Sequence, residues 1–454
     1  MKKLISLMLV LVMTLSLFAA CGKGGDKKDG GESNSNGGSE SSDSASESGV
    51  IKGDGGEGDI SYAIDASLAS SATPVDVGSL YTADSMIDAG IQRPGNVQRL
   101  ASALYRASNG EPIKLAFIGG DATQGQGASS PEKAYAELVR KWWDETFPKT
   151  DVTLINLGLA GQDSYIADHR VAKELIPEKP DVVFIETALY ENQALAEESF
   201  ECLTRQLLSC ESQPAIIPII LTNSSLTDFS QTQSALAFKM DLPVINFGAV
   251  VKNNINGNIW KWTDIADENT GDLNDTGHAF LARLVTEYCN RVLKGMEGST
   301  YKEYVLTDQT SSKCRYMNAS FLRAEDFSAT GFIADGIDNS PLAGISNGYS
   351  THDGTAGEFT ITGSNIGLVW YKTIDGNGGT FDVYVDGTKV KEKLAGSNIA
   401  VGEELTEEEL AKAYPEIDKT ELGKFDNGPH TIRIEKSEDS KGDWFFIIGF
   451  TVSQ

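Results

Sequence analysis

Histidine and positively charged residues are scarce in this sequence. Only four histidines occur among its 454 residues, so few mechanisms that need an imidazole base are open to it. The 38 lysines and arginines are outnumbered by 65 aspartates and glutamates, which leaves a formal net charge of -27. A charge this negative repels phosphate backbones, and we therefore expect no nucleic-acid partner.

Cysteine is also rare. The chain has five cysteines, with no CxxC pair and no Cys/His cluster, so we expect no zinc site. One cysteine, Cys21, follows the N-terminal apolar run, and the other four are expected to be buried thiols.

Only one stretch is apolar enough for a membrane, and it lies at the N-terminus. Lys2 and Lys3 precede an apolar run that ends at Ala20, which is the pattern of an export signal. A cysteine directly after small residues resembles the lipobox of bacterial lipoproteins, in which that residue receives lipid. We expect residues 1–21 to anchor the protein through Cys21 to the outer face of the cytoplasmic membrane. Secretion with an unmodified cysteine is the alternative.

Composition divides the remaining chain into three parts. Residues 22–57 consist almost wholly of Gly, Ser, Asn, Lys and acidic residues, with too little apolar surface to offset the entropy of ordering, so we expect a disordered tether. Residues 58–298 form the second part and residues 299–454 the third, because the periodicity of the apolar residues changes near residue 300.

The second part alternates strand and helix patterns. Short apolar runs occur at residues 114–118, 152–156, 181–185, 215–221 and 243–246, and amphipathic helical stretches separate most of them. This alternation predicts a parallel sheet covered on both faces, a three-layer α/β fold. Ligands of such sheets bind beyond the carboxyl ends of the strands, which directs attention to the loops at 119–129, 156–164, 186–193 and 262–278.

Those loops resemble the conserved blocks of the SGNH (GDSL-type) hydrolases. Gly119 to Gly125, GGDATQG, is similar to block I, and Asn156 to Ser164, NLGLAGQDS, is similar to block II. The strand at 181–185 leads into block III, and Asp272 to His278, DLNDTGH, resembles block V. The matches run in order through about residues 90–295. They imply the flavodoxin-like three-layer sheet of an SGNH-type hydrolase.

The chemistry of that family is missing from the matching positions. Its members use a Ser nucleophile, an Asp-x-x-His pair and an oxyanion hole formed by the nucleophile N–H, a Gly and an Asn. By register the Ser position holds Asp121, the Asn position Tyr190, the His position Asp272 and the Asp position Asn269, while Gly161 is retained. A carboxylate is a poor acyl nucleophile and places negative charge where the oxyanion forms. His278 is expected to cap or pack rather than to act as a base.

Two acidic replacements that face one pocket leave other chemistry open. Asp121 and Asp272 form a carboxylate pair of the kind that separates an acid from a base, as in glycosidases. They are also able to hold a divalent cation, with Asp275 or Glu191 as a third ligand. A structural role in an abandoned active site is the simplest alternative. No cofactor is otherwise expected.

A glycan is the partner that the site residues favour. Tyr190 is able to stack on a sugar ring or simply to pack, and Trp260 and Trp262 flank the block V loop as an extension of such a platform. With Gly120, Gly161 and Asn269, these aromatic residues are the expected binding residues.

The third part is expected to be all-β. Strand-like runs at 358–362, 366–371, 381–385, 430–434 and 445–450, with Asp386-Gly387 as a hairpin turn, predict a β-sandwich or jelly roll. It resembles the carbohydrate-binding-type domains that accompany this hydrolase group, and a structural lid is the alternative. The whole sequence therefore predicts a surface lipoprotein that binds extracellular or cell-wall glycan on a catalytically degenerate hydrolase fold. An active carbohydrate esterase that uses Asp121 and Asp272 in an altered mechanism is the alternative.

Overall fold

The computed structural model describes residues 48–51, 58–65, 67–68, 73–192, 194–227, 230–337, 346–374, 376–399, 406 and 416–454. The expected signal peptide, Cys21 and most of the tether lie outside these residues. Four residues of the tether range form a strand, β1 (Ser48–Ile51), which pairs with β2 (Tyr62–Asp65). That part of the range is therefore not without secondary structure, and the prediction of a wholly disordered tether was wrong there. Within the described residues, no helix has the length and apolar character needed to span a bilayer.

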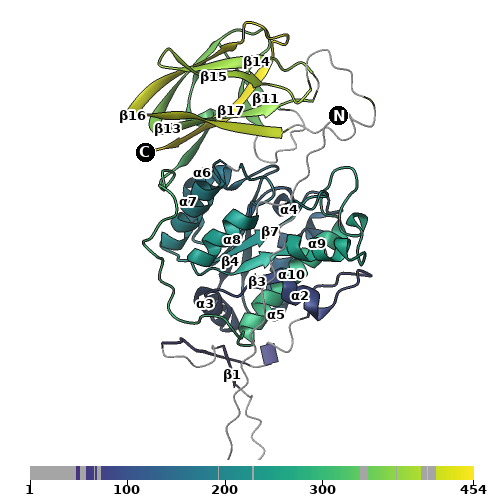
Figure 1. Cartoon of the computed structure of the whole chain (residues 1–454). Helices are drawn as coiled ribbons and strands as arrows, with labels where there is room; N and C mark the ends of the chain where they lie inside the picture. Colours follow the sequence, from purple (N-terminus) through teal and green to yellow (C-terminus); the bar gives the residue numbers. More distant parts are fainter. Residues whose placement is uncertain are drawn as a thin grey trace, which may run out of the picture. The chain divides into compact units, whose positions relative to one another are not determined.

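A six-stranded sheet forms the centre of the α/β domain, among the residues that the structure describes (Figure 1). Its strands, listed in spatial order, are β3 (Ile91–Arg93), β8 (Val244–Asn246), β7 (Ala215–Ile220), β6 (Val182–Glu186), β4 (Ile113–Gly119) and β5 (Val152–Gly158). Every neighbouring pair is parallel except β3 with β8. The expected parallel sheet is confirmed. The antiparallel edge strand β3 was not predicted, since three residues carry too little pattern.

Helices cover both faces of the sheet, because successive side chains of a strand point to opposite sides. Leu115 and Phe117 of β4 belong to one core, whereas Ala116 and Ile118 belong to the other. The first face packs against α2 (Asp84–Gly90), α3 (Gln98–Ser108), α5 (Tyr135–Thr146), α9 (Phe247–Asn256) and α10 (Asp275–Leu293). The second packs against α6 (Ser164–Glu174), α7 (Ala196–Ser209) and α8 (Ser230–Lys239). Short helices η1 (Pro131–Lys133), η2 (Ile176–Glu178) and η3 (Trp262–Asp264) lie in the connections.

The strand order places a crevice at the carboxyl end of β4. The chain leaves β4 for β5 on one side and later returns to β6 on the other, so the loops that follow β4 and β6 diverge. The loop after β4 is a tight turn into α4 (Asp121–Gln124). Residues that follow these two strands therefore meet at the position where open α/β sheets bind ligands.

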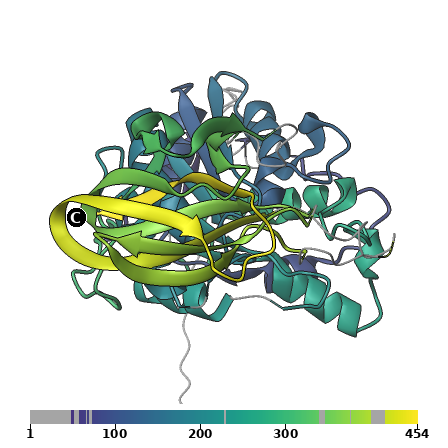
Figure 2. The same cartoon turned by 90° about the horizontal axis from the view of Figure 1, so that it is seen from above.

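The C-terminal domain is all-antiparallel, as predicted. Nine strands of the described residues join in one curled sheet, drawn in green to yellow in Figure 2: β9 (Ser320–Arg323), β10 (Ala329–Thr330), β11 (Ile333–Gly336), β12 (Asn347–Thr351), β13 (Gly357–Lys372), β14 (Thr380–Val385), β15 (Thr388–Ala395), β16 (Glu416–Lys436) and β17 (Phe445–Ser453). A short helix, η4 (Ala324–Asp326), follows β9. The two runs predicted at 358–362 and 366–371 are one strand, β13, which bends at a register shift after Gly363. Asp386 and Gly387 both have positive φ, 49° and 79°, and form the predicted turn between β14 and β15.

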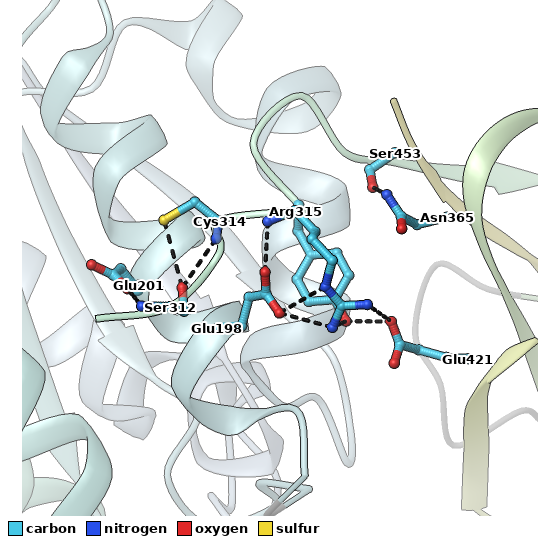
Figure 3. A network of polar contacts seen from close by, with 9 residues as sticks. Glu198, Glu201, Ser312, Cys314, Arg315, Asn365, Glu421 and Ser453 are labelled. Carbon is cyan, nitrogen blue, oxygen red and sulfur yellow. Dashed lines mark hydrogen bonds and ion pairs between the residues drawn. The ribbon is translucent and has the colours of Figure 1, made fainter. Parts of the chain in front are cut away.

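An apolar cluster joins the two domains, and we call it the interdomain cluster. It contains Leu159, Tyr165, Ile166, Leu195 and Cys202 from the α/β domain, and Tyr316, Ala319, Phe321, Val369, Tyr371, Phe446 and Ile448 from the rest of the chain. Polar contacts surround it. Arg315 bridges Glu198 of α7 and Glu421 of β16, with nitrogen–oxygen distances of 2.8 and 3.1 Å (Figure 3). A continuous apolar contact of this kind holds two domains in one arrangement.

Candidate functional site

Asp121 lies at the crevice between β4 and β6, at the first position of α4. Its carboxyl group lies close to the side chain of Tyr190, the backbone N–H of Gly161 and its own backbone N–H, and all three favour its charged form. These are the positions that the SGNH resemblance assigns to the three donors of an oxyanion hole. The side chain of Asp121 thus lies among these three groups.

Asp272 lies near enough to affect Asp121. Burial is the main cause that raises the pKa of Asp121, and the negative charge of Asp272 raises it further. Tyr190 and Gly161 oppose this rise, since they favour the charged form. The two carboxyl groups therefore influence one another through their charges.

The two predicted glycine positions of the site favour glycine for different reasons. A Cβ on Gly120 would lie 2.8 Å from the ring of Tyr190, so any larger residue displaces that ring from Asp121. Gly161 has a positive φ of 68°, which a residue with a side chain adopts only at a cost. Its Cβ position faces open space. The backbone N–H of Gly161 is therefore presented by a conformation that glycine makes accessible.

Glu186 is a site residue that the sequence did not single out. It ends β6, is only 1% exposed, and its Oε2 accepts hydrogen bonds from Gly120 N–H at 3.1 Å and from Thr123 Oγ1 at 3.0 Å. Burial raises its pKa to about 8, and the charge of Asp121 adds to the rise. A third carboxyl group, neutral near pH 7, therefore lies beneath the Asp121 turn. Its position at the end of an apolar strand was the only signal in the sequence.

His278 is buried within the domain and does not face a substrate. Its Nδ1 accepts the backbone N–H of Tyr135 at 3.2 Å, which fixes the proton on Nε2, and Nε2 donates to the carbonyl of Gln126 at 2.8 Å. Burial lowers its pKa, so the ring is neutral. The packing role expected for His278 agrees with these contacts.

The prediction that Trp260 extends a binding platform was wrong because its side chain is buried, whereas Trp262 is partly exposed. Trp260 is 3% exposed, packs edge-on against Phe280 and donates its indole N–H to the carbonyl of Tyr81. Trp262 is half-buried against the same core, and its indole nitrogen is covered. Sequence proximity to block V did not reveal that their side chains turn toward the core.

Asn269, the residue at the family's Asp position, is exposed in the loop before α10. Its backbone N–H donates to the Asp267 carboxylate at 2.8 Å, which forms a local turn. No contact in the structure joins it to Asp121, so its assignment as a binding residue lacks support.

The two proposed third ligands of a cation are engaged elsewhere. Asp275 pairs with Lys133 at 2.5 Å and accepts Ser129 N–H, which lowers its pKa to about 2. Glu191 is buried among hydroxyl and amide groups. In the described part of the chain, no group of three or more His, Cys, Asp or Glu side chains is arranged to hold a metal ion.

Comparison with known proteins identifies the fold. No protein-family model and no curated protein matches the chain. Among solved structures, it is similar to a two-domain esterase (CEX) active on acetylated mannans, co-crystallised with mannopentaose, with 22% identity and a TM-score of 0.70. A second structure of a two-domain esterase (CEX) active on acetylated mannans gives 23% identity and a TM-score of 0.69. Each match covers 81% of this chain and 98% of the other.

The chain has the two-domain fold of that esterase. The matches extend through both the α/β domain and the antiparallel domain, since neither alone makes up 81% of the chain. The resemblance to SGNH-type carbohydrate esterases therefore holds at the level of the fold. The positions that the resemblance assigns to the nucleophile and to the Asn donor hold Asp121 and Tyr190 in this chain.

Proposed function

We propose that this protein binds a glycan and does not hydrolyse its esters. The observation that carries the proposal is the position of the Asp121 carboxyl group, which lies beside its own N–H, the N–H of Gly161 and the side chain of Tyr190, all of which favour its charged form. An oxyanion hole accelerates acyl transfer only when its donors are free to bind the charge that develops on the substrate. Here they already bind an anion that belongs to the protein.

The nucleophile and base of an esterase are also absent from this pocket. A carboxylate is a weak acyl nucleophile, and a Ser–His pair works because neutral imidazole accepts the hydroxyl proton. His278 has both ring nitrogens bound to backbone groups. Binding of the glycan without cleavage is the function that such a pocket retains.

A neutral glycan suits the charge of the protein. A net charge of -27 disfavours uronic-acid polymers and phosphate-bearing polymers. The similar esterase structures are described as active on acetylated mannans, and one holds mannopentaose. We therefore take mannan-type chains as the first ligands to test. The N-terminal pattern adds that the protein presents this site outside the cell, anchored through Cys21.

An altered hydrolase is the second candidate, and one observation favours it. Burial and the negative charge of Asp272 raise the pKa of Asp121, and a carboxyl group with a raised pKa holds a proton more readily than an ordinary aspartate. Such a pair is able to act as acid and base.

Acetate release and glycan binding, measured on the same preparation, separate the two candidates. The compact unit from Ser46 to Gln454 is the protein to use. It is incubated with acetylated mannan, acetylated xylan and acetylated peptidoglycan beside an Asp121→Ala variant, and titrated with mannopentaose in a calorimeter. Binding without acetate release above the variant is the expected result. Release that disappears in Asp121→Ala overturns the proposal and makes the carboxylate catalytic.

A further inference from the structure

A buried ion pair crosses from the β domain to the loop that carries Gly161. The Nζ atom of Lys419, in β16, lies 3.0 Å from Oδ2 of Asp163, and the two side chains are 10% and 0% exposed. Lys419 is registered opposite Val369 of β13, a member of the interdomain cluster. The lysine therefore projects from the face of the β domain that packs against the α/β domain.

Asp163 fixes the conformation of the loop after β5. It is the N-cap of α6, and its Oδ1 accepts the backbone N–H of Ile166 at 3.0 Å. It follows Gly161 by two residues, so the cap and the N–H that binds Asp121 belong to one short turn. A shift of Asp163 moves that N–H.

Glu191 connects the same charge cluster to the loop after β6. Its carboxyl group accepts hydrogen bonds from Ser164 Oγ at 2.9 Å, Thr187 Oγ1 at 3.2 Å and Gln233 Nε2 at 2.6 Å. Burial and the charge of Asp163 raise its pKa to about 8, while Lys419 opposes the rise. It directly follows Tyr190 in the chain. Both loops that supply donors to Asp121 are therefore attached to one cluster.

We propose that Lys419 is a positioning residue of the site, through which the β domain holds the loops of Gly161 and Tyr190 against Asp121. Separating the two residues would leave the buried carboxylate of Asp163 without a counter-ion, which costs folding free energy. This cost holds the loop of Gly161 and Lys419 together. This deepens the proposed function, since it assigns the β domain a role in shaping the site. It stands on contacts that are present whether or not a glycan binds.

The other ion pairs across this contact are more exposed and offer a matched control. Lys173 of α6 pairs with Asp326 of η4 at 2.9 Å, with 56% and 26% of the side chains exposed. Exposed pairs contribute little because water and salt screen them. Loss of Lys173 removes an interdomain ion pair without touching the loop of Gly161.

The readout is the pKa of Asp121, measured by NMR of aspartate carboxyl carbons in the full chain and assigned with Asp121→Asn. Lys419→Met is expected to raise it by about half a pH unit or more, because displaced donors no longer favour the charged form. Lys419→Arg and Lys173→Met are expected to leave it within about 0.2 unit, which is small against the ordinary spread of such values.

A charge-neutral double variant keeps the test decisive. Lys419→Met with Asp163→Asn removes both charges, retains a residue able to cap α6, and avoids an unpaired buried carboxylate. The same upward shift is expected in it relative to the parent protein, because the pair is removed without a change in net charge. A pKa of Asp121 that matches the Lys173→Met value in both Lys419→Met and the double variant overturns the proposal. The measurement needs no ligand. A failure of the proposed glycan binding therefore does not change its result, and the two proposals are tested independently.

Discussion

The side chain of Tyr190 lies against the carboxyl group of Asp121 and favours its charged form. By register the two residues stand where the SGNH resemblance places the Asn of an oxyanion hole and the nucleophilic Ser. The two side chains complement one another, because a tyrosine hydroxyl is a donor and a carboxylate is an acceptor.

Removal of the Tyr190 hydroxyl should raise the pKa of Asp121. In Tyr190→Phe the ring still packs over Gly120, whereas the donor that favours the charged carboxylate is lost. We expect the pKa of Asp121 to rise by roughly 0.5 to 1 unit. Carboxyl-carbon NMR measures it. Tyr105→Phe, at a ring that stacks on Tyr62 away from the site, is the control, and an equal shift there would contradict the assignment.

Reconstruction of the family's residues should create esterase activity. The variant combines Asp121→Ser, Tyr190→Asn, Asn269→Asp and Asp272→His, and it keeps the backbone N–H groups at 121 and 161. In the matched control, position 121 carries Ala, which removes the nucleophile and leaves the backbone N–H. Acetate release from acetylated mannan by the reconstructed variant should exceed that of this control by about 100-fold or more. Equal rates in the two proteins would show that the loops do not hold an active geometry.

Glu186 should make the protein less stable as pH rises. Its pKa is about 8 in the folded protein, against an ordinary value of 4.5 that we assign to the unfolded chain. Between these two pH values the folded protein retains a proton that the unfolded chain has released. The stabilisation is complete below about pH 4.5 and is lost as pH passes through 8. The amide of Glu186→Gln cannot ionise. The variant should therefore not show the loss of unfolding free energy at high pH, on the order of 4 kcal/mol, that Glu186 causes in the parent protein.

Urea unfolding from pH 4 to 9 measures the Glu186 effect as a slope. The amide changes the unfolding free energy by an amount that does not depend on pH. Comparing the slopes of unfolding free energy against pH removes this constant difference. Exposed Glu297→Gln serves as the control. A slope in Glu186→Gln as steep as in the parent chain would mean that the buried carboxyl titrates normally.

His278 should matter for stability and not for ligand binding. In His278→Leu, the N–H of Tyr135 and the carbonyl of Gln126 lose their buried partner. Each unsatisfied group costs about 1 to 3 kcal/mol, so we expect a loss of roughly 2 to 5 kcal/mol in unfolding free energy. The affinity for mannopentaose should stay within about twofold of the parent value, a small change in binding free energy. A selective loss of affinity at normal stability would instead place His278 in the binding site.

The succession of strands and helices along the chain and the all-β character of the C-terminal part followed from the sequence. Apolar runs such as Val182 to Ile185 are buried on both faces, and such burial leaves a continuous apolar run that local residues carry. The loops that contain Asp121 and Gly161 follow two neighbouring parallel strands, whose carboxyl ends meet at one edge.

Only the tertiary structure decided what those residues do to one another. Trp260 is two residues from Trp262 and close to block V, yet both turn to the core, since the direction of a side chain in a loop depends on packing that local sequence does not encode. Glu186 is an ordinary acidic residue in the sequence, and burial beneath the Asp121 turn is what raises its pKa. Lys419 lies in a strand far along the chain, and its contact with Asp163 exists because two domains pack together. Hydrogen-bond direction, burial and long-range charge pairing are properties of the folded arrangement, and they set the chemistry of this site.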